Sequence, residues 1–306
     1  MFSWAVRVLS DWTILQEKET CAVPVRDRGR PLDSRRVAFF DSGIGGLSVL
    51  AEALRRLPNE NYLYYADTRH VPYGNKSREE VRGCVMDAAA EIMRHNVKAL
   101  VVACNTATSV AIRDLRAMYG IPIIGMEPAV KPAVAITGPA GKRVLVLATP
   151  LTLGQDKYAE LVSRVDDGNV VDSLALPELV EKCERLEFDG EGVRGLLREK
   201  LAGADLSRYA AVVLGCTHFP FYRPVLERLL PPHIRLLDGA EGTVRRLSQV
   251  LQENDLLHPG GTGDVTFLSS GGKEEDLLRM EQAFAYIRGA VSGDSCFAAR
   301  HHMDKR

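Results

Sequence analysis

The feature that most constrains the fold of this chain is an internal repeat. The segment RVAFFDS at 36–42 recurs as RVLVLAT at 143–149, which lies 107 residues further along. Three more pairs follow in the same order at offsets of 108, 112 and 113: NYLYYADTRHVPYG with NVVDSLALPELVE, ALVVACNTA with AAVVLGCTHF, and IPIIGMEPAV with IRLLDGAEGTV. Four matches in one order indicate two homologous halves, whose equivalent loops would face each other across an interdomain cleft.

The repeated segments contain short apolar runs that alternate with longer amphipathic stretches. The expected strands are VAFF (37–40), YLYYA (62–66), ALVVA (99–103), IPIIG (121–125), VLVLA (144–148), AAVVLG (210–215) and IRLL (234–237). Most are continuously apolar, which is typical of parallel strands covered by helices on both faces, and helical patterns at 47–57 and 78–96 lie between them. We therefore expect an α/β fold of two similar doubly wound domains related by pseudo-twofold symmetry, with the active site in the cleft between them.

Length and the repeat together predict the domain organisation. A chain of 306 residues suits two domains. The segment RDRGRPLDSRR is charged and punctuated by Pro and Gly, which is typical of a linker or a solvated arm. We expect an N-terminal arm at 1–35, a first α/β domain at 36–134 plus about 241–290, a second α/β domain at 135–240, and a C-terminal tail at 291–306.

Composition and charge argue against several function classes. The 39 basic and 40 acidic residues give a formal net charge of −1, which argues against a nucleic-acid binder or an electrostatic membrane binder. No run of about 18 apolar residues occurs, so we expect no membrane span. The six cysteines include no CxxC pair. Unpaired thiols and an N-terminus unlike a secretory signal indicate a reducing cytoplasm.

Two cysteines occupy equivalent positions in the two halves. Cys104 follows ALVVA and Cys216 follows AAVVLG, so each is expected at the carboxyl end of a strand, the edge where open α/β sheets bind ligands. Each would also open the following helix, whose N–H groups and dipole favour a thiolate. A lone cysteine in such a place is more often a small buried hydrophobe. Two at matching positions, each followed by polar residues, favour chemistry.

Opposed thiols suit the removal of a proton from one face of a stereocentre and the return of a proton to the other. Each thiol acts as a base when ionised and as an acid when protonated. Asp41, at the end of the first strand, is a candidate partner of Cys104, and His218 is a candidate partner of Cys216. The alternatives are that Asp41 caps a helix and that His218 is simply hydrogen-bonded at a helix start.

The segment DSGIGGLS at 41–48 is a glycine-rich loop between a strand and a helix. It lacks the third glycine of GxGxxG and the GK[ST] of a P-loop, so it gives little support to a nucleotide site. Its backbone N–H groups, with Ser42 beside them, could hold a carboxylate. A tight turn that allows close helix packing is compatible with that role.

Six motifs in this chain, in their order and spacing, resemble the glutamate racemases: FFDSGIGGLSVL, YADTRHVPYG, VVACNTAT, GMEPAVKPA, VLATPLT and VVLGCTHFP. The resemblance runs from about residue 37 to about residue 288. The paired CNT and GCTH motifs are specific to the aspartate/glutamate racemase superfamily, and the FDSGIGGLSV opening points to its glutamate branch. The resemblance implies an isomerase that interconverts L- and D-glutamate and supplies D-glutamate for peptidoglycan synthesis, and thus for cell-wall biogenesis and cell shape.

The resemblance also implies roles for individual residues. Cys104 would take the α-proton of D-glutamate and Cys216 that of L-glutamate. Asp41 would assist Cys104, and His218 would assist Cys216 together with a glutamate of the second half.

The family's PLVE segment corresponds to ELVE here, which makes Glu181 the assisting glutamate and leaves Glu178 as the alternative. The positions that match the family's substrate contacts are Asp41, Ser42, Tyr73, Gly74, Asn105, Thr106, Thr149, Thr217 and His218. Thr149 is also the counterpart of Ser42 in the internal repeat.

The resemblance implies no cofactor, and the sequence shows no metal-ligand spacing, since His301 and His302 in the charged tail look like a solvated end. The implied partner is the substrate glutamate, and a homodimer is compatible with the resemblance. Some members of this family carry an N-terminal extension and respond to the peptidoglycan precursor UDP-N-acetylmuramoyl-L-alanine. We therefore hypothesise that such an activator acts through the arm at 1–35.

Three alternatives remain at this point. A related superfamily racemase, isomerase or decarboxylase would act on another acid such as aspartate, although retention of both cysteines favours racemisation. A two-domain protein that binds an acidic metabolite without catalysis would leave the Cα proton of glutamate unexchanged. A pyridoxal-phosphate racemase would show the absorbance band of its cofactor.

Overall fold

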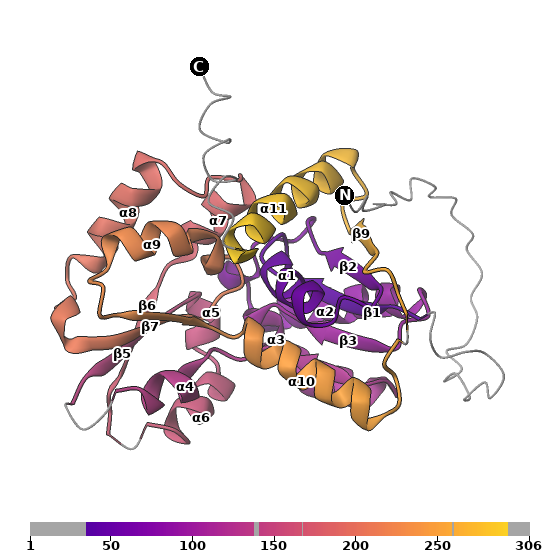
Figure 1. The fold of residues 1–306 in the computed structure, drawn as a ribbon, viewed down its shortest axis with the longest axis horizontal. Coiled ribbons are helices and arrows are strands. Elements are labelled where there is room, and N and C mark those ends of the chain that lie inside the picture. Colours follow the sequence, from indigo (N-terminus) through magenta and orange to yellow (C-terminus); the bar gives the residue numbers. More distant parts are fainter. Residues whose placement is uncertain (1–34, 138–140, 167, 259, 293–306) are drawn as a thin grey trace.

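The structure is a computed structural model that describes residues 35–137, 141–166, 168–258 and 260–292. Two sheets form two lobes that lie side by side, the first on the right and the second on the left of Figure 1. The arm expected at 1–35 lies outside the described residues except for residue 35, and so does the tail expected at 291–306 except for its first two residues. No helix among the described residues is long and apolar enough to span a membrane.

Both sheets are wholly parallel and share one strand order. The first, β4-β3-β1-β2-β9, consists of β1 (Val37–Asp41), β2 (Tyr62–Ala66), β3 (Ala99–Val102), β4 (Ile123–Gly125) and β9 (Val265–Ser269). The second, β6-β5-β7-β8, consists of β5 (Arg143–Ala148), β6 (Val171–Ala175), β7 (Tyr209–Leu214) and β8 (Arg235–Asp238). Read from its other end, the second sheet repeats the order of the first four strands of the first sheet.

The repeat extends to the pairing of individual residues. Phe40 of β1 pairs with Val102 of β3, and Leu147 of β5 pairs with Leu214 of β7. The second pair lies 107 and 112 residues after the first, the same offsets that the sequence shows. The expected fold class, two similar doubly wound α/β halves, is therefore confirmed.

Helices cover both faces of the first sheet. They are α1 (Leu47–Arg56), α2 (Arg78–Met93), α3 (Asn105–Met118), α10 (Ala240–Glu253) and α11 (Glu274–Ser292), with the short 3₁₀ helix η2 (Tyr73–Asn75) before α2. Successive strand side chains point to opposite faces. Val37 and Phe39 therefore join the core formed with α1, α10 and α11, whereas Ala38 and Phe40 join the core formed with α2 and α3.

The second sheet is covered in the same way by shorter helices. They are α4 (Val130–Ala135), α5 (Pro150–Leu153), α6 (Asp156–Ser163), α7 (Pro177–Glu184), α8 (Glu191–Leu201) and α9 (Arg223–Leu229), with the 3₁₀ helices η3 (Leu206–Arg208) and η4 (Phe219–Tyr222). Val144 and Val146 of β5 pack against α4 and α6. The alternate residues Leu145 and Leu147 point to the other face, into a core shared with the first half.

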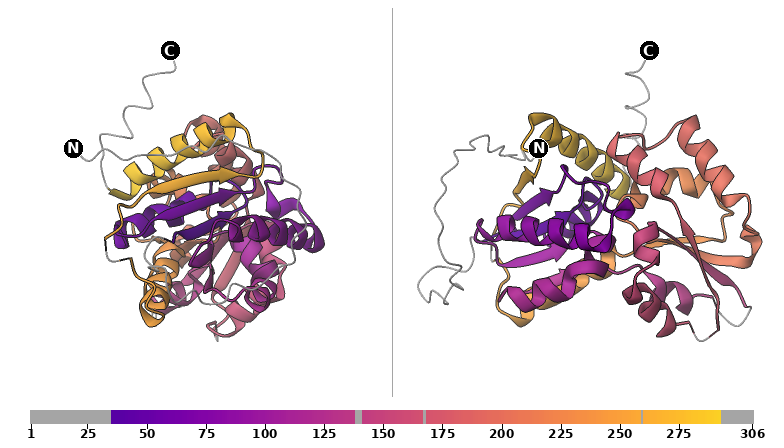
Figure 2. Two further views of the ribbon diagram at one scale, coloured as in Figure 1. Left: turned by 90° about the vertical axis from the view of Figure 1, so that its right-hand side faces the viewer. Right: turned by 180° about the vertical axis from the view of Figure 1, so that it is seen from behind.

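This shared core fixes the two halves against each other. One continuous cluster of buried side chains extends from Phe39 in the first sheet to Leu147 in the second. At its edge, Phe188 stacks on Phe221 with ring centroids 4.9 Å apart and on Tyr286 of α11 at 4.3 Å. Figure 2 shows the same two lobes in contact when viewed from behind. The loops at the carboxyl ends of the two sheets are thereby held in register across the contact.

The chain enters the second half once and leaves it once. It departs after β4, builds the second sheet, and returns through α10, β9 and α11 to complete the first half. The helix α4 packs on β5 and β7, so its side chains belong to the second half. The sequence-based boundary had instead placed residues up to 134 in the first domain. The expected strands did not include β6, and β9 was expected only as part of the returning segment.

Candidate active site

The first cysteine lies just after β3, at the carboxyl edge of the first sheet. Cys104 is the N-cap residue of α3 and is 5% exposed. Its Sγ accepts the N–H of Ala107 at 3.4 Å and donates to Oγ of Ser42 at 3.7 Å. This thiol is therefore buried at a helix N-terminus, where backbone N–H groups favour negative charge.

The second cysteine has a different backbone setting. Cys216 lies two residues after β7 and is followed by η4, whose N-cap is His218. The N–H of Phe219 bonds to the carbonyl of Cys216 at 3.1 Å, so a turn separates the thiol from the helix. The expectation that each cysteine opens a helix is therefore right for Cys104 and wrong for Cys216. Instead, Sγ of Cys216 lies 3.6 Å from Nδ1 of His218.

A buried chain of side chains continues from this second thiol. Nε2 of His218 lies 2.7 Å from Oε1 of Glu184, the last residue of α7. The same oxygen accepts the N–H of Ile44 at 2.9 Å, so the carboxylate also contacts the glycine-rich loop of the first half. His218 is 2% exposed and Glu184 is 9% exposed. A thiol, an imidazole and a carboxylate of the second half thus form one hydrogen-bonded series, which the N–H of Ile44 joins to the first half.

The predictions of Glu181 and of its alternative Glu178 as the partner of His218 are wrong, because Glu184 occupies that place. Glu181 is exposed, and Glu178 pairs with Lys200 at 2.6 Å on the surface of α7. Glu178, Glu181 and Glu184 follow one another at intervals of three residues on one short helix. The matched segment ELVE contains the first two and ends before Glu184. A sequence signal existed, since Glu184 follows four residues after the buried Val180 and shares its face of the helix.

Asp41 is the carboxylate of the first half. It is completely buried, its Oδ1 accepts the N–H of Gly43 at 3.1 Å, and its Oδ2 accepts the hydroxyl of Thr217 from the second half at 2.9 Å. It is not a helix cap, because Gly46 is the N-cap of α1. Among the described residues, no hydrogen bond links Asp41 to Cys104, so their coupling is electrostatic.

Asp41, Cys104 and His218 all have raised pKa values, but the cause differs between the two halves. Burial raises the pKa of Asp41 to about 6. Burial also raises the pKa of the Cys104 thiol, and the charges of Asp41 and, to a smaller extent, Cys216 raise it further. Burial lowers the pKa of His218, but its hydrogen bonds to Cys216 and Glu184 outweigh burial and raise this pKa well above 6.5. A cation therefore stands beside Cys216 and an anion near Cys104.

The glycine-rich loop allows these groups to approach. A Cβ atom at Gly43 would lie 1.9 Å from Oε1 of Glu184, and one at Gly45 would lie 2.5 Å from Nδ1 of His218. Only glycine leaves the second half enough room at these positions. The sequence suggested that the loop could hold a carboxylate. In the described structure its N–H groups hold two of the protein's own carboxylates, since Gly43 donates to Asp41 and Ile44 to Glu184.

A cluster of hydroxyls makes a second bridge between the halves. Oγ1 of Thr106 on α3 lies 3.1 Å from that of Thr149 and 3.0 Å from that of Thr152, both at the start of α5. Gly74 packs against the same place, because a Cβ there would lie 2.7 Å from Cβ of Thr149. Thr152 was not predicted from the sequence, since its role depends on the meeting of two distant loops.

The remaining predicted contacts also lie at this edge. Tyr73 in η2 is buried and donates its hydroxyl to Oδ2 of Asp67 at 2.6 Å. Asn105, the first residue of α3, is 4% exposed, and neither its side-chain oxygen nor its nitrogen has a partner among the described residues. An unpaired buried amide is costly, so this side chain is suited to bind a polar ligand.

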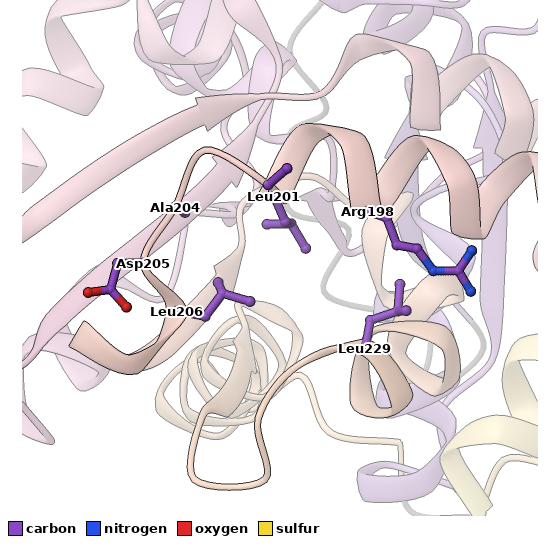
Figure 3. A pocket seen from close by; sticks show the side chains of 7 residues that line it. Arg198, Leu201, Ala204, Asp205, Leu206 and Leu229 are labelled. Atoms are coloured by element: carbon purple, nitrogen blue, oxygen red, sulfur yellow. The ribbon is translucent and has the colours of Figure 1, made fainter.

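A pocket of about 370 Å³ lies elsewhere in the second half (Figure 3). Leu201 of α8, Leu206 of η3 and Leu229 of α9 line it, with Arg198 and Asp205 at opposite ends. None of these elements carries a cysteine of the pair, and the lining offers no nucleophile. The chemistry described above therefore lies at the contact between the halves and not in this pocket.

Comparison with known proteins agrees with this geometry. Residues 44–247 match the model of the Asp/Glu/Hydantoin racemase family. The chain is 49% identical over 245 residues to a glutamate racemase of Halothermothrix orenii, covering 80% of this chain and 96% of that protein. It is 47% identical over 241 residues to glutamate racemase 2 of Bacillus subtilis, covering 79% of this chain and 91% of that protein.

A solved structure is similar over the same span. The glutamate racemase of Escherichia coli, crystallised with L-glutamate and the activator UDP-MurNAc-Ala, superimposes with a TM-score of 0.70 at 31% identity. The superposition covers 82% of this chain and 95% of the Escherichia coli chain. Both halves and the contact between them are therefore included in the similarity.

Proposed function

The chain belongs to the Asp/Glu/Hydantoin racemase family and, within it, to the glutamate racemases, and we propose that it interconverts L-glutamate and D-glutamate without a cofactor. It is accordingly an isomerase. One observation carries the proposal of mechanism: two buried thiols follow equivalent strands of two repeated sheets and belong to one contiguous site. A base and an acid on opposite sides of one carbon are what an inversion of configuration requires.

In the direction from D-glutamate, the Cys104 thiolate removes the Cα proton and the Cys216 thiol delivers its own proton to the opposite face. The product is L-glutamate, and the enzyme is left with a Cys104 thiol and a Cys216 thiolate. In the direction from L-glutamate, the two thiols exchange roles. Each turnover therefore leaves the enzyme in the protonation state that the other enantiomer requires. Before the same enantiomer can react again, Cys104 loses a proton to the solvent and Cys216 takes one from it.

The neighbours of each thiol assist these transfers in different ways. Protonated His218, held by Glu184, points one N–H to Sγ of Cys216 and places a positive charge beside the thiol that must ionise. Burial and then the charge of Asp41 keep the pKa of Cys104 high, so the Cys104 thiolate is a strong base once it forms. A strong base is needed because the Cα proton of an amino acid is a weak acid.

Binding of the substrate uses the polar groups at the same edge. We assign the amino and carboxylate groups of glutamate to the side chains and N–H groups at Ser42, Asn105, Thr106, Thr149 and Thr217, with Tyr73 and Gly74 beside them. The unpaired amide of Asn105 supports this assignment. Both thiols are less than a tenth exposed, so glutamate enters only when the halves separate, and closure then excludes water from the reaction.

The test is nuclear magnetic resonance of the purified protein with L-glutamate in deuterated water, without added cofactor. Loss of the Cα proton signal, together with formation of D-glutamate, is expected. Exchange of the Cα proton of L-aspartate but not of L-glutamate would show that the substrate is another acid. The absence of exchange in folded protein with either acid would contradict racemisation and leave a binding protein.

In the cell, we propose that the D-glutamate supplies peptidoglycan synthesis, and thereby cell-wall biogenesis and cell shape. A cytoplasmic location agrees with the unpaired thiols Cys84, Cys104, Cys183 and Cys216 among the described residues. Depletion of the protein in its host should lead to lysis that added D-glutamate prevents, and lysis that D-glutamate does not prevent would contradict this role.

Two partners are proposed with the activity. The first is a second copy of the chain, and light scattering of the purified protein tests the homodimer. The second is a peptidoglycan precursor of the kind bound in the Escherichia coli structure, which we propose to act through the arm at 1–35. A chain that lacks residues 1–35 should lose the response of its turnover to UDP-N-acetylmuramoyl-L-alanine, and an unchanged response would overturn this part of the proposal.

A further inference from the structure

A second group of chemically reactive side chains lies outside the series described above. Among the described residues, Asp67, His70 and Cys84 bring one carboxylate oxygen, one imidazole nitrogen and one sulfur within 4.8 Å of one another. Asp67 directly follows β2, His70 lies in the turn after it, and Cys84 lies on α2. The sequence shows no recognised metal-ligand spacing here, because the fold brings the helix residue to the other two.

We propose that Asp67, His70 and Cys84 form a binding site for a zinc ion. Zinc accepts mixed oxygen, nitrogen and sulfur ligands in a tetrahedron, and a site with three protein ligands keeps its fourth position for water. Carboxylate, imidazole and thiolate are also the donors that give transition metals their tight sites, in contrast to the all-oxygen sites of calcium and magnesium.

The geometry of the group supports coordination. Zinc bonds of about 2.0–2.3 Å place neighbouring ligand atoms about 3.3–3.7 Å apart. Nδ1 of His70 already lies 2.9 Å from each oxygen of Asp67. The side chain of His70 is 42% exposed, and Cys84 is half-buried, so both can adjust their torsions around an entering ion.

Neighbouring groups already hold Asp67 in a fixed orientation. The hydroxyl of Tyr73 donates to Oδ2 of Asp67 at 2.6 Å, which leaves Oδ1 for the metal and holds the carboxylate in orientation. Ligating carboxylates in metal sites are usually hydrogen-bonded in this way. The N–H of His70 bonds to the carbonyl of Asp67 at 3.1 Å, so the two ligands also share a fixed backbone turn.

The protons balance as follows. The thiol of Cys84 loses its proton to the solvent on binding, Asp67 binds as carboxylate, and His70 binds through Nδ1 with its remaining proton on Nε2. The complex has one water at the fourth position. The ion would tie α2 to the turn that precedes Tyr73, and thereby stabilise one wall of the site between the halves.

The proposal is tested by zinc binding to the full chain, measured by competition with a coloured chelator. The double variant C104A/C216A is the starting protein, because the two thiols of the racemase site can bind zinc on their own. We expect it to bind one zinc ion tightly, and H70A or C84A added to it should weaken binding at least about tenfold. Cobalt in place of zinc should show a thiolate-to-cobalt absorption band that is lost with Cys84.

Matched controls separate this site from other histidines. His95 also lies near a carboxylate, 3.9 Å from Glu91. These two residues do not belong to the group of Asp67, His70 and Cys84, so H95A should leave zinc binding unchanged. The variant H301A/H302A controls for the tail and should also leave it unchanged. If C84A does not fold, C84S and the more exposed H70A provide the same comparison. Equal affinity in H70A, C84A and the starting protein, or no tight binding by the starting protein, would overturn the proposal.

Discussion

The surroundings of the two thiols differ far more than the sheets that carry them. The strands before Cys104 and Cys216 have equivalent partners and registers, yet Cys104 has a long helix and a nearby carboxylate, whereas Cys216 has an imidazole and no helix directly after it. Burial and Asp41 raise the pKa of Cys104, while a pKa well above 6.5 keeps His218 charged beside Cys216.

The repeated topology determines where the two thiols lie, and the side chains around them determine their chemical surroundings. The repeated sheets place two sulfur atoms in one site, and side chains from several elements then give each atom different surroundings, Asp41 near Cys104 and His218 with Glu184 beside Cys216. The difference between the surroundings of the two thiols does not make one direction of the reaction more efficient than the other. The two enantiomers have equal free energies, so kcat/KM must be the same in both directions whatever the surroundings of each thiol.

The largest expected effect comes from removing either thiol. C104A and C216A should each lower racemisation in both directions by at least about 10²–10⁴-fold, because one of the two proton transfers then lacks its group. Circular dichroism of the glutamate in solution measures the rate. The control is C84A, assayed like the parent with metal-free protein, which removes a half-buried thiol outside the racemase site and should keep parental turnover. A thiol variant with near-parental rates would break the proposed equivalence of the two positions.

The next effect concerns the carboxyl on the Cys104 side. The pKa of Asp41 is about 6 in the folded chain against 3.8 in the unfolded chain, which corresponds to about 3 kcal/mol. Because the folded state binds this proton more tightly, the contribution of Asp41 to stability is full below pH 3.8 and is lost as the pH rises to 6 and above. D41N keeps an acceptor for Gly43 and has no such dependence.

Urea unfolding at pH 4 and pH 7 measures this difference. Relative to the parent, D41N should be more stable at pH 7 than at pH 4 by up to this amount, while its turnover falls at both values. A constant difference between the two proteins across this range would show that the ionisation of Asp41 is not coupled to folding.

A smaller effect is expected from the carboxylate on the Cys216 side. E184Q leaves His218 without its charged partner, and a lost hydrogen bond to a charged group costs about 1.5–3 kcal/mol, which is about 10–150-fold in kcat. E181Q changes an exposed glutamate of the same helix and should stay within about twofold. Steady-state rates against pH separate the two variants, because only E184Q should shift the ionisation of His218. Equal losses in both variants would reject the pairing.

The smallest of these effects tests the contact between the halves. G45A adds a methyl group where 2.5 Å separates it from the ring of His218, so closure is incomplete and kcat/KM should fall about tenfold. G83A, on the exposed side of α2 with no atom within 4 Å, should leave kcat/KM unchanged and add about 0.5–1 kcal/mol of stability. Parental kcat/KM in G45A would show that the halves need not approach this closely.

Much of the fold could be predicted because the apolar strands recur in order. Seven strands were expected close to their observed bounds, and the repeat predicted two similar halves, which the matching strand order agrees with. The strand β9 was harder, because VTFLS has no counterpart in the second half and its partner β2 lies about 200 residues earlier. A short edge strand that closes from so far away leaves no local sequence signal.

Site residues that follow or end a strand could be predicted from the sequence. Site residues whose position depends on how a helix is rotated about its axis could not. Cys104, Cys216 and Asp41 follow or end strands, so the sheet alone brings them to one edge. Glu184 reaches His218 only because α7 turns that face inward, which tertiary packing decides. Asp67 was missed for another reason, because its contact with Tyr73 depends on how the single loop between β2 and η2 folds back on itself.

The return of the chain to the first half has a consequence for its synthesis. As the protein emerges from the ribosome, all four strands of the second sheet are available before residue 265 is made, whereas β2 waits for β9 from residue 66 onward. The nascent first half therefore has an open strand edge for most of translation, and such edges recruit other chains. We expect the second half to fold first. The first half should depend on chaperones until α11 has been synthesised.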